Sequence, residues 1–162
     1  MGRFILAPLL ALAMLGCGIL IPAADDPAAR AKADERDLCG TQDAATAPLH
    51  VEKVRPFYRT MPSKSGHDSR VAGAILYVTP EPGTTAVLLE RKLRCRAARE
   101  VTAGTQAPDD PFSLPGGLPK ISVEADDARL AITVSDDARG PELLDRARRY
   151  SRKFAETRPS VW

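Results

Sequence analysis

The sequence predicts a small α+β domain, and three observations lead to that prediction. Residues 71–79 form an apolar run of strand length, and apolar side chains recur at helical spacing over residues 84–101. Further on, residues 121–125 and 130–134 alternate apolar and polar side chains, as the two strands of a hairpin do. A second amphipathic stretch over residues 141–154 completes the order strand, helix, strand, strand, helix.

The strand at 71–79 and the helix after it are the clearest elements. Apolar side chains occupy both sides of this strand, so we expect it to be buried on both faces. A turn rich in proline and glycine follows, and Thr84 or Thr85 is suited to cap a helix that runs to about Val101. The core stripe of this helix lies within a narrow arc and consists of Ala86, Leu89, Leu93, Ala97 and Val101.

The remaining elements follow from turn chemistry and spacing. Asp126-Asp127-Ala128 links the hairpin strands, and Pro141 sits early in the second helix, where its missing N–H is harmless. The apolar stripe of that helix consists of Leu143, Ala147, Tyr150 and Phe154. Residues 62–70 and 102–119 are expected to be loops. A further strand is expected near residues 49–58, and Pro56 restricts it to an edge of the sheet.

This order of elements predicts a ferredoxin-like βαββα sandwich, with two helices on one face of an antiparallel sheet. Aromatic residues make up only 5% of the chain, so the core must be mostly aliphatic. The domain is expected to span residues 49–157, followed by a short tail at 158–162.

Residues 1–24 are predicted to direct export from a bacterial cytoplasm. Arg3 precedes an uncharged apolar run over residues 4–21. Three outcomes are open: cleavage after Ala23 with a soluble product, cleavage before a lipidated Cys17 in its lipobox-like context, or retention as a membrane anchor. We expect an exported protein located in the periplasm or, as a lipoprotein, at the outer membrane, with a soluble secreted protein as the alternative.

Residues 25–48 are predicted to be a disordered tether. They are rich in alanine, aspartate and proline and contain almost no large apolar side chain, so they cannot bury enough surface to offset the entropy of ordering. Loss or lipidation of Cys17 leaves Cys39 and Cys95, and two cysteines in an oxidising compartment are a natural disulfide pair. Cys95 lies opposite the apolar stripe of its helix, together with Leu88, so we expect the Cys39 segment to cross that outer surface.

Several segments between residues 71 and 155 carry a resemblance: Ala72-Gly73-Ala74-Ile75-Leu76-Tyr77-Val78, Glu81-Pro82-Gly83-Thr84-Thr85-Ala86, Leu93-Arg94-Cys95-Arg96 and Ser135-Asp136-Asp137. Over this range the chain resembles a family of uncharacterised bacterial exported proteins that has no established activity. The resemblance implies export and the fold described above. In that family a histidine usually follows the helix cysteine, and a Tyr-Cys-Pro-like segment occurs in the long loop. Here Arg96 and Phe112-Ser113-Leu114 occupy these places, which removes both local partners that Cys95 would have for a metal site or a disulfide.

The sequence gives little support to metal or catalytic chemistry. The candidate soft or borderline ligands are not at ligand-like spacing; they are Cys39, Cys95, His50 and His67. No nucleophile elbow or other catalytic constellation occurs, so we expect neither an enzyme nor a cofactor. A metal-handling or metal-sensing module remains the alternative, by analogy of fold alone.

Basic side chains on the two helices are the feature most suggestive of function. The candidate anion-binding residues are Arg91, Lys92, Arg94, Arg96 and Arg99 on the first helix, and Arg146, Arg149, Arg152 and Lys153 on the second. If both helices cover one sheet face, their outer surfaces form a cationic layer that would meet an acidic protein or an anionic envelope component. The net charge of +2 is too small to indicate nucleic acid. The sequence therefore predicts a non-enzymatic interaction domain, held at the membrane by its lipid or signal anchor.

Overall fold

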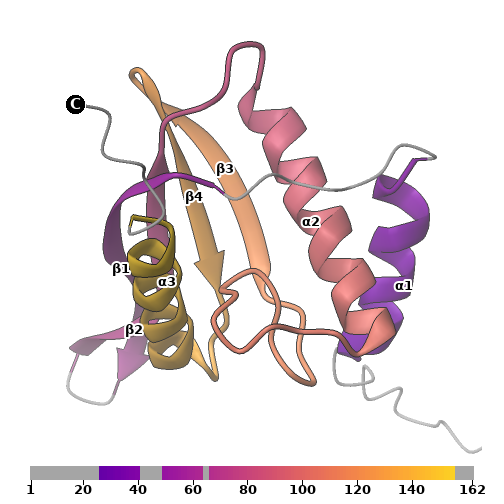
Figure 1. Ribbon diagram of the computed structural model, residues 1–162. Helices are drawn as coiled ribbons and strands as arrows, with labels where there is room; N and C mark the ends of the chain where they lie inside the picture. The colour runs from indigo at the N-terminus through magenta and orange to yellow at the C-terminus, as the bar shows by residue number, and fades with distance from the viewer. Residues whose placement is uncertain (1–25, 41–48, 64–65, 156–162) are drawn as a thin grey trace, which may run out of the picture.

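An antiparallel sheet of four strands, ordered β1-β2-β4-β3, forms the centre of the fold (Figure 1). The computed structural model describes residues 26–40, 49–63 and 66–155. The elements in chain order are α1 (Pro27–Leu38), β1 (Val51–Ser63), β2 (Gly66–Val78), α2 (Ala86–Ala103), β3 (Lys120–Asp126), β4 (Arg129–Ser135) and α3 (Gly140–Ala155). The α+β class and the antiparallel sheet are confirmed.

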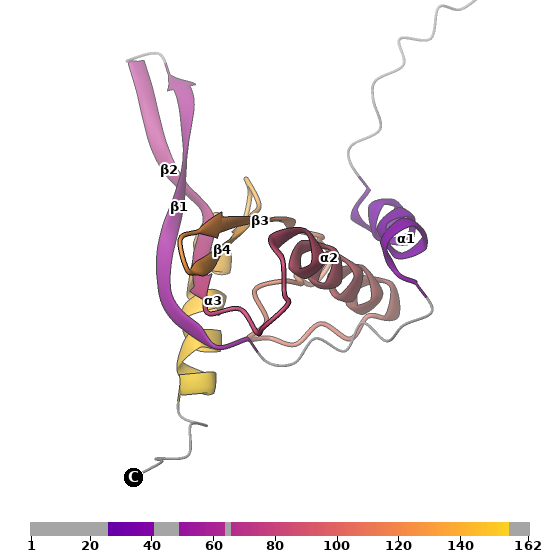
Figure 2. The ribbon, with the colours of Figure 1, turned by 90° about the horizontal axis from the view of Figure 1, so that it is seen from above.

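The core lies on one face of this sheet. Leu76, Ile132 and Val134 are fully buried there. Helix α2 covers the face at β3 and contributes Leu93, while α3 covers it at β1 and β2 and contributes Leu143. The opposite face has no helix over it in the described part of the chain (Figure 2). The expectation that residues 71–79 are buried on both faces is therefore wrong, since the side chains of this strand that point away from the helices stay partly exposed.

Helix α2 begins after Thr85, one of the two predicted caps, and ends at Ala103, two residues beyond the predicted end near Val101. The Thr85 side chain accepts a hydrogen bond from the Leu88 amide at 3.2 Å, which satisfies one of the free donors of the first turn. At the other end Gly104 has φ 69°, a left-handed conformation that glycine adopts without strain. Leu89, Leu93 and Ala97 are buried, so the predicted core stripe is confirmed.

β1 is an edge strand, as Pro56 indicates, but the hairpin it forms with β2 is longer than predicted. Residues 62–70 were expected to be a loop, whereas β1 continues to Ser63 and β2 begins at Gly66. The pairing runs from Val51↔Val78 to Ser63↔Gly66, with irregularities between Val51 and Lys53 and between Phe57 and Tyr58. The loop prediction was wrong because polar residues can extend a hairpin whose two strands are already aligned by the sheet.

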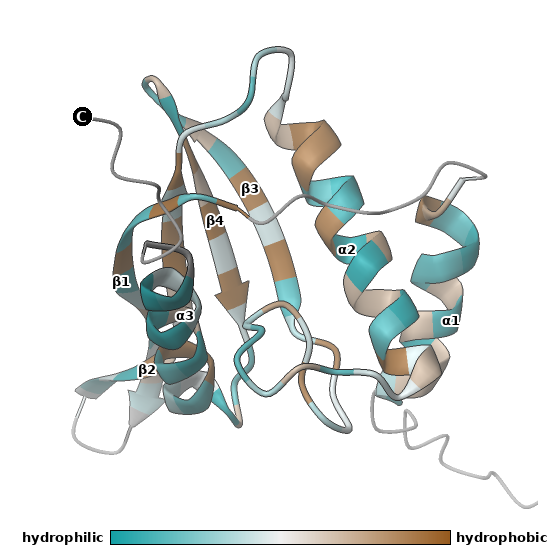
Figure 3. Cartoon of the chain, viewed as in Figure 1, coloured by the Kyte–Doolittle hydropathy of each residue, from teal (hydrophilic) through white to brown (hydrophobic). Residues whose placement is uncertain are grey.

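Residues 27–38 form helix α1, so the prediction of a disordered tether is wrong for this segment. The Asp26 side chain accepts a hydrogen bond from the Ala28 amide at 3.0 Å, and Pro27 occupies the start of the helix. Ala31 is fully buried where α1 packs on α2. The helix has few apolar residues but many good helix formers, and alanine allows a close approach to its neighbour. Its surface is largely hydrophilic (Figure 3).

Several predictions concern residues outside the described ones. They include the export signal at 1–24 with Cys17, the segment 41–48 of the tether and the tail at 158–162. No helix within residues 26–40, 49–63 and 66–155 is long and apolar enough to cross a membrane.

Gly140 marks a close contact between α3 and the sheet. A Cβ at this position would lie 2.2 Å from the Val71 carbonyl oxygen and 2.5 Å from the Ala72 Cα. We expect Gly140→Ala to lower the free energy of unfolding by about 1–3 kcal/mol, because the helix must move off the strand. Urea denaturation followed by circular dichroism measures this change. Gly40→Ala is the control, since a Cβ at Gly40 meets no atom within 4 Å.

Candidate functional site

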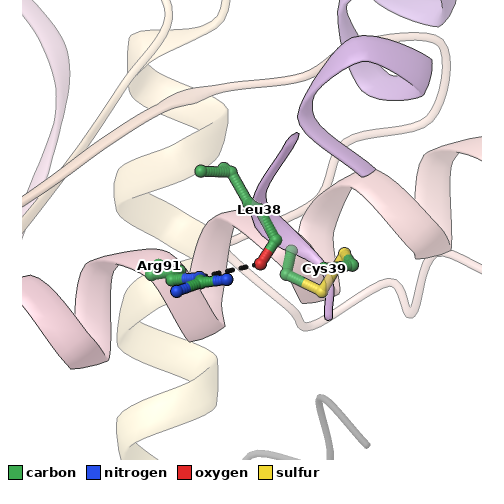
Figure 4. Close-up of a disulfide and its surroundings, with 4 residues drawn as sticks. Leu38, Cys39 and Arg91 are labelled. Carbon is green, nitrogen blue, oxygen red and sulfur yellow. Dashed lines mark hydrogen bonds between the residues drawn. A yellow bond between two sulfur atoms is a disulfide. The ribbon is translucent and has the colours of Figure 1, made fainter. Parts of the chain in front are cut away.

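A disulfide between Cys39 and Cys95 joins α1 to α2, as the sequence predicts, with the two Cα atoms 5.2 Å apart. Beside it Arg91 Nε donates a hydrogen bond to the Leu38 carbonyl oxygen at 2.9 Å (Figure 4). One turn further, Arg94 forms an ion pair of 3.0 Å with Asp34. The segment that crosses α2 is therefore a helix and not an irregular tether. Cys95 lies outside the main core, but α1 covers it and leaves it 3% exposed.

The basic residues of α2 and α3 do not form one open cationic layer. Arg91 and Arg94 bind α1, as described above, and three further arginines bind carboxylates or carbonyl groups: Arg96, Arg146 and Arg149. Lys92, Arg152 and Lys153 are exposed and Arg99 is half-buried. The sequence reasoning missed this because it expected only an irregular tether to cross the outer side of α2, whereas the helix α1 packs along that side.

Arg96 is the centre of a polar network that fixes the 104–119 loop to α2. Its Nε lies 2.8 Å from Glu100 Oε1, and its guanidinium also forms an ion pair with Asp110, which is 3% exposed. The fully buried Ser113 donates to Glu100 Oε2 at 2.5 Å. Arg96 and Ser113 therefore belong to one network that holds the loop on α2.

α3 holds the same loop from its other side. Arg149 Nε lies 2.9 Å from Asp109 Oδ1, and this hydrogen bond is the main cause that raises the pKa of the Arg149 guanidinium. The nearly buried Arg146 donates to the Ala107 carbonyl oxygen at 3.2 Å. The loop carries Phe112 into the core between the helices, where its ring lies edge-on to Tyr150 at 5.8 Å between centroids. These arginines therefore stabilise the fold.

The open face of the sheet gathers cationic side chains around one aromatic ring. Tyr77 on β2 lies beneath two guanidinium groups, with Arg55 5.8 Å and Arg129 5.4 Å from the ring centroid. Lys53 is the cross-strand neighbour of Tyr77 on β1. With Asp126, which forms a 3.1 Å ion pair with Arg129, these residues line a hollow of about 210 Å³. We call this group of residues the Tyr77 site.

A second hollow, of about 250 Å³, has a more balanced charge. Its basic residues are Arg30, Arg59 and Lys120, and its acidic residues are Asp136 and Asp137. Arg59 is bound to Asp137 at 2.5 Å. The Tyr77 site sets three basic side chains against one carboxylate, so it has the larger excess of positive charge. It is the stronger candidate for an anionic ligand.

Sequence reasoning did not single out the residues of the Tyr77 site. The available signal was the period-2 alternation that places Lys53 and Arg55 on one side of β1, but it is useful only once the uncovered face of the sheet is known.

Within residues 26–40, 49–63 and 66–155, no group of three or more His, Cys, Asp or Glu side chains is arranged to hold a metal ion. In comparisons with known proteins, the chain matches no family model, no curated protein and no solved structure.

Proposed function

We propose that this protein is a non-enzymatic binding module of the bacterial cell envelope, which binds an anionic group of its partner at the Tyr77 site. The apolar segment at 4–21 supports export, with Cys17 as the point of lipid attachment. The domain then acts by presenting a surface to its partner.

We also infer a ferredoxin-like arrangement for the domain. β4 lies between β2 and β3, which α2 connects, and this is the split β-α-β unit of such folds. β1 enters by a hairpin and occupies the edge beside β2. In this arrangement the helices cover one face and leave the other available for binding.

The cation cluster around Tyr77 is the observation that carries the proposal. Guanidinium groups bind carboxylates and phosphates through paired hydrogen bonds, and Arg55 and Arg129 stand over a single ring that limits their freedom. Asp126 forms an ion pair with Arg129, so the positive charges of Arg55 and Lys53 remain in excess at the site. The site is therefore suited to a carboxylate or phosphate group.

We expect Arg55→Ala and Arg129→Ala to weaken binding of an anionic probe. Isothermal titration of the purified protein with a Glu-rich peptide, inorganic phosphate and anionic vesicles in parallel identifies which source of anion is bound. Each substitution should weaken binding of the probe by about tenfold or more at low salt, because one charge-assisted contact contributes about 1.5–3 kcal/mol.

Lys92→Ala and Arg148→Ala are the matched controls, since both remove an exposed positive charge from a helix. Equal weakening by these controls would mean that only the overall charge matters, and the Tyr77 site would lose its support. Failure of the wild-type protein to bind any of the three probes at low salt would contradict the proposal.

A metal-handling module is not favoured by any observation of the described residues. A metal site at Cys95 requires a reduced thiol, and Cys95 is bonded to Cys39. Thiol titration of protein purified from the envelope distinguishes the two functions, because the disulfide leaves neither cysteine to react.

A further inference from the structure

β1 and β2 continue together beyond the rest of the sheet as a two-stranded arm, formed by residues 58–63 and 66–71. β4 pairs with β2 only from Gly73 to Val78, whereas β1 follows β2 as far as the Ser63↔Gly66 pair. The arm projects away from the helices (Figure 2). Residues 66–70 are all exposed. A two-stranded ribbon of this kind is only marginally stable in water by itself.

The arm has one edge that is suited to pairing with another strand. Along residues 66–71 no strand of the described chain pairs with β2 on the side away from β1. This edge contains no proline, whereas β1 carries Pro56 and Pro62, which lack a backbone donor. The unpaired stretch of this edge ends at Ala72, because the Ala72 carbonyl oxygen accepts a hydrogen bond from the Asp136 amide at 2.9 Å. Unpaired edges of this type are templates for an added strand.

The charge pattern of the edge complements itself. If two copies pair antiparallel about Ser69, Asp68 of each copy lies directly opposite Arg70 of the other. Within one chain Arg70 lies opposite Arg59 instead, and Arg59 already has its carboxylate partner in Asp137, so Arg70 meets no countercharge across the hairpin. A second copy therefore supplies the countercharge that Arg70 lacks across its own hairpin.

We propose that two copies of this chain associate through the 66–71 edges of β2, antiparallel and centred on Ser69. The two arms then form one continuous ribbon of four strands. The contact is isologous, so each Asp68–Arg70 pair occurs twice and the assembly closes as a dimer. The Tyr77 site lies on the shared part of the sheet and not on the arm, so the dimer presents two copies of it.

Cysteine trapping at the two-fold axis tests this register. Ser69→Cys in the full chain places the two new thiols directly opposite each other, at a separation of about 4.5–5.5 Å between Cβ atoms, from which small adjustments allow a disulfide. Under mild oxidation we expect a covalent dimer on a non-reducing gel at low micromolar protein. Thr102→Cys, at an exposed position near the end of α2, is the control and should crosslink much more slowly. Equal crosslinking rates for the two variants would overturn the proposal.

Charge exchange provides an independent measurement by sedimentation equilibrium. Asp68→Arg and Arg70→Asp alone should each weaken the dimer by about tenfold, since each converts two attractive pairs into repulsive ones. The double variant Asp68→Arg/Arg70→Asp restores both pairs and should return the dissociation constant to near the wild-type value. Arg70→Asp also removes a like charge from the position opposite Arg59 within one hairpin, so a loss of dimer in this variant does not come from a weakened arm. A double variant as weak as the single ones, or a monomeric wild-type chain, would contradict the register.

Discussion

Replacing Arg96 with methionine is expected to lower the free energy of unfolding by about 3–5 kcal/mol. The substitution retains an unbranched side chain but removes the cation that Asp110 and Glu100 share. Asp110 is 3% exposed, and its carboxylate also accepts a hydrogen bond from the Phe112 amide at 2.8 Å. A buried carboxylate without its countercharge is costly, so the 104–119 loop should detach from α2 or the fold should weaken as a whole. Urea denaturation followed by circular dichroism measures the loss.

Lys92→Met is the matched control for this experiment. Lys92 lies on the same helix, is exposed, and forms no ion pair within the described part of the chain. Its substitution should change the unfolding free energy by less than about 0.5 kcal/mol. If Arg96→Met were as mild as this control, the network would not fix the loop, and Arg96 would regain its standing as a candidate anion-binding residue.

Removing the disulfide by Cys39→Ser/Cys95→Ser is expected to have an effect of similar size. The bond closes a loop between residues separated by 56 positions, and loss of that closure costs about 4 kcal/mol on chain-entropy grounds. The effect should be concentrated in α1, because a helix of 12 residues is marginal alone and the ion pair between Asp34 and Arg94 is partly exposed. Hydrogen exchange should show fast exchange of the α1 amides while the sheet stays protected.

Hydrogen exchange of the reduced wild-type protein separates the effect of losing the disulfide from the effect of introducing the two serines. Both forms should show a lower melting temperature and a folded sheet, since the core cluster uses Leu76, Leu93 and Leu143 without the disulfide. Unchanged protection of α1 after reduction would show that packing around Ala31 is sufficient to hold this helix.

Local signals predicted the parts of the fold that depend on neighbouring residues in the chain. Thr85 caps the start of α2 because capping requires only the adjacent backbone, and the β3–β4 hairpin follows from alternation around a short turn. The pairing of Cys39 with Cys95 was also accessible, because helical geometry placed Cys95 away from the core stripe.

The remaining features depend on which surfaces meet in three dimensions. α1 has little apolar surface, so composition alone indicated disorder, but the disulfide and Ala31 place it on α2. That placement directs Arg91 and Arg94 toward α1 and removes them from the expected cationic layer. The Tyr77 site likewise requires β1 and β4 to flank β2, and strand order is not encoded in the spacing of residues along any one strand.

The disulfide also determines how the domain responds to mechanical tension. If the chain is tethered at its N-terminus, a pull is transmitted through α1 to Cys39 and across the sulfur atoms into the middle of α2. The force therefore bypasses β1, although β1 comes next in the chain and, as an edge strand, would be the easiest to peel from the sheet. The segment enclosed by the crosslink, which contains β1, β2 and Tyr77, is therefore shielded from a pull that comes from the N-terminal side.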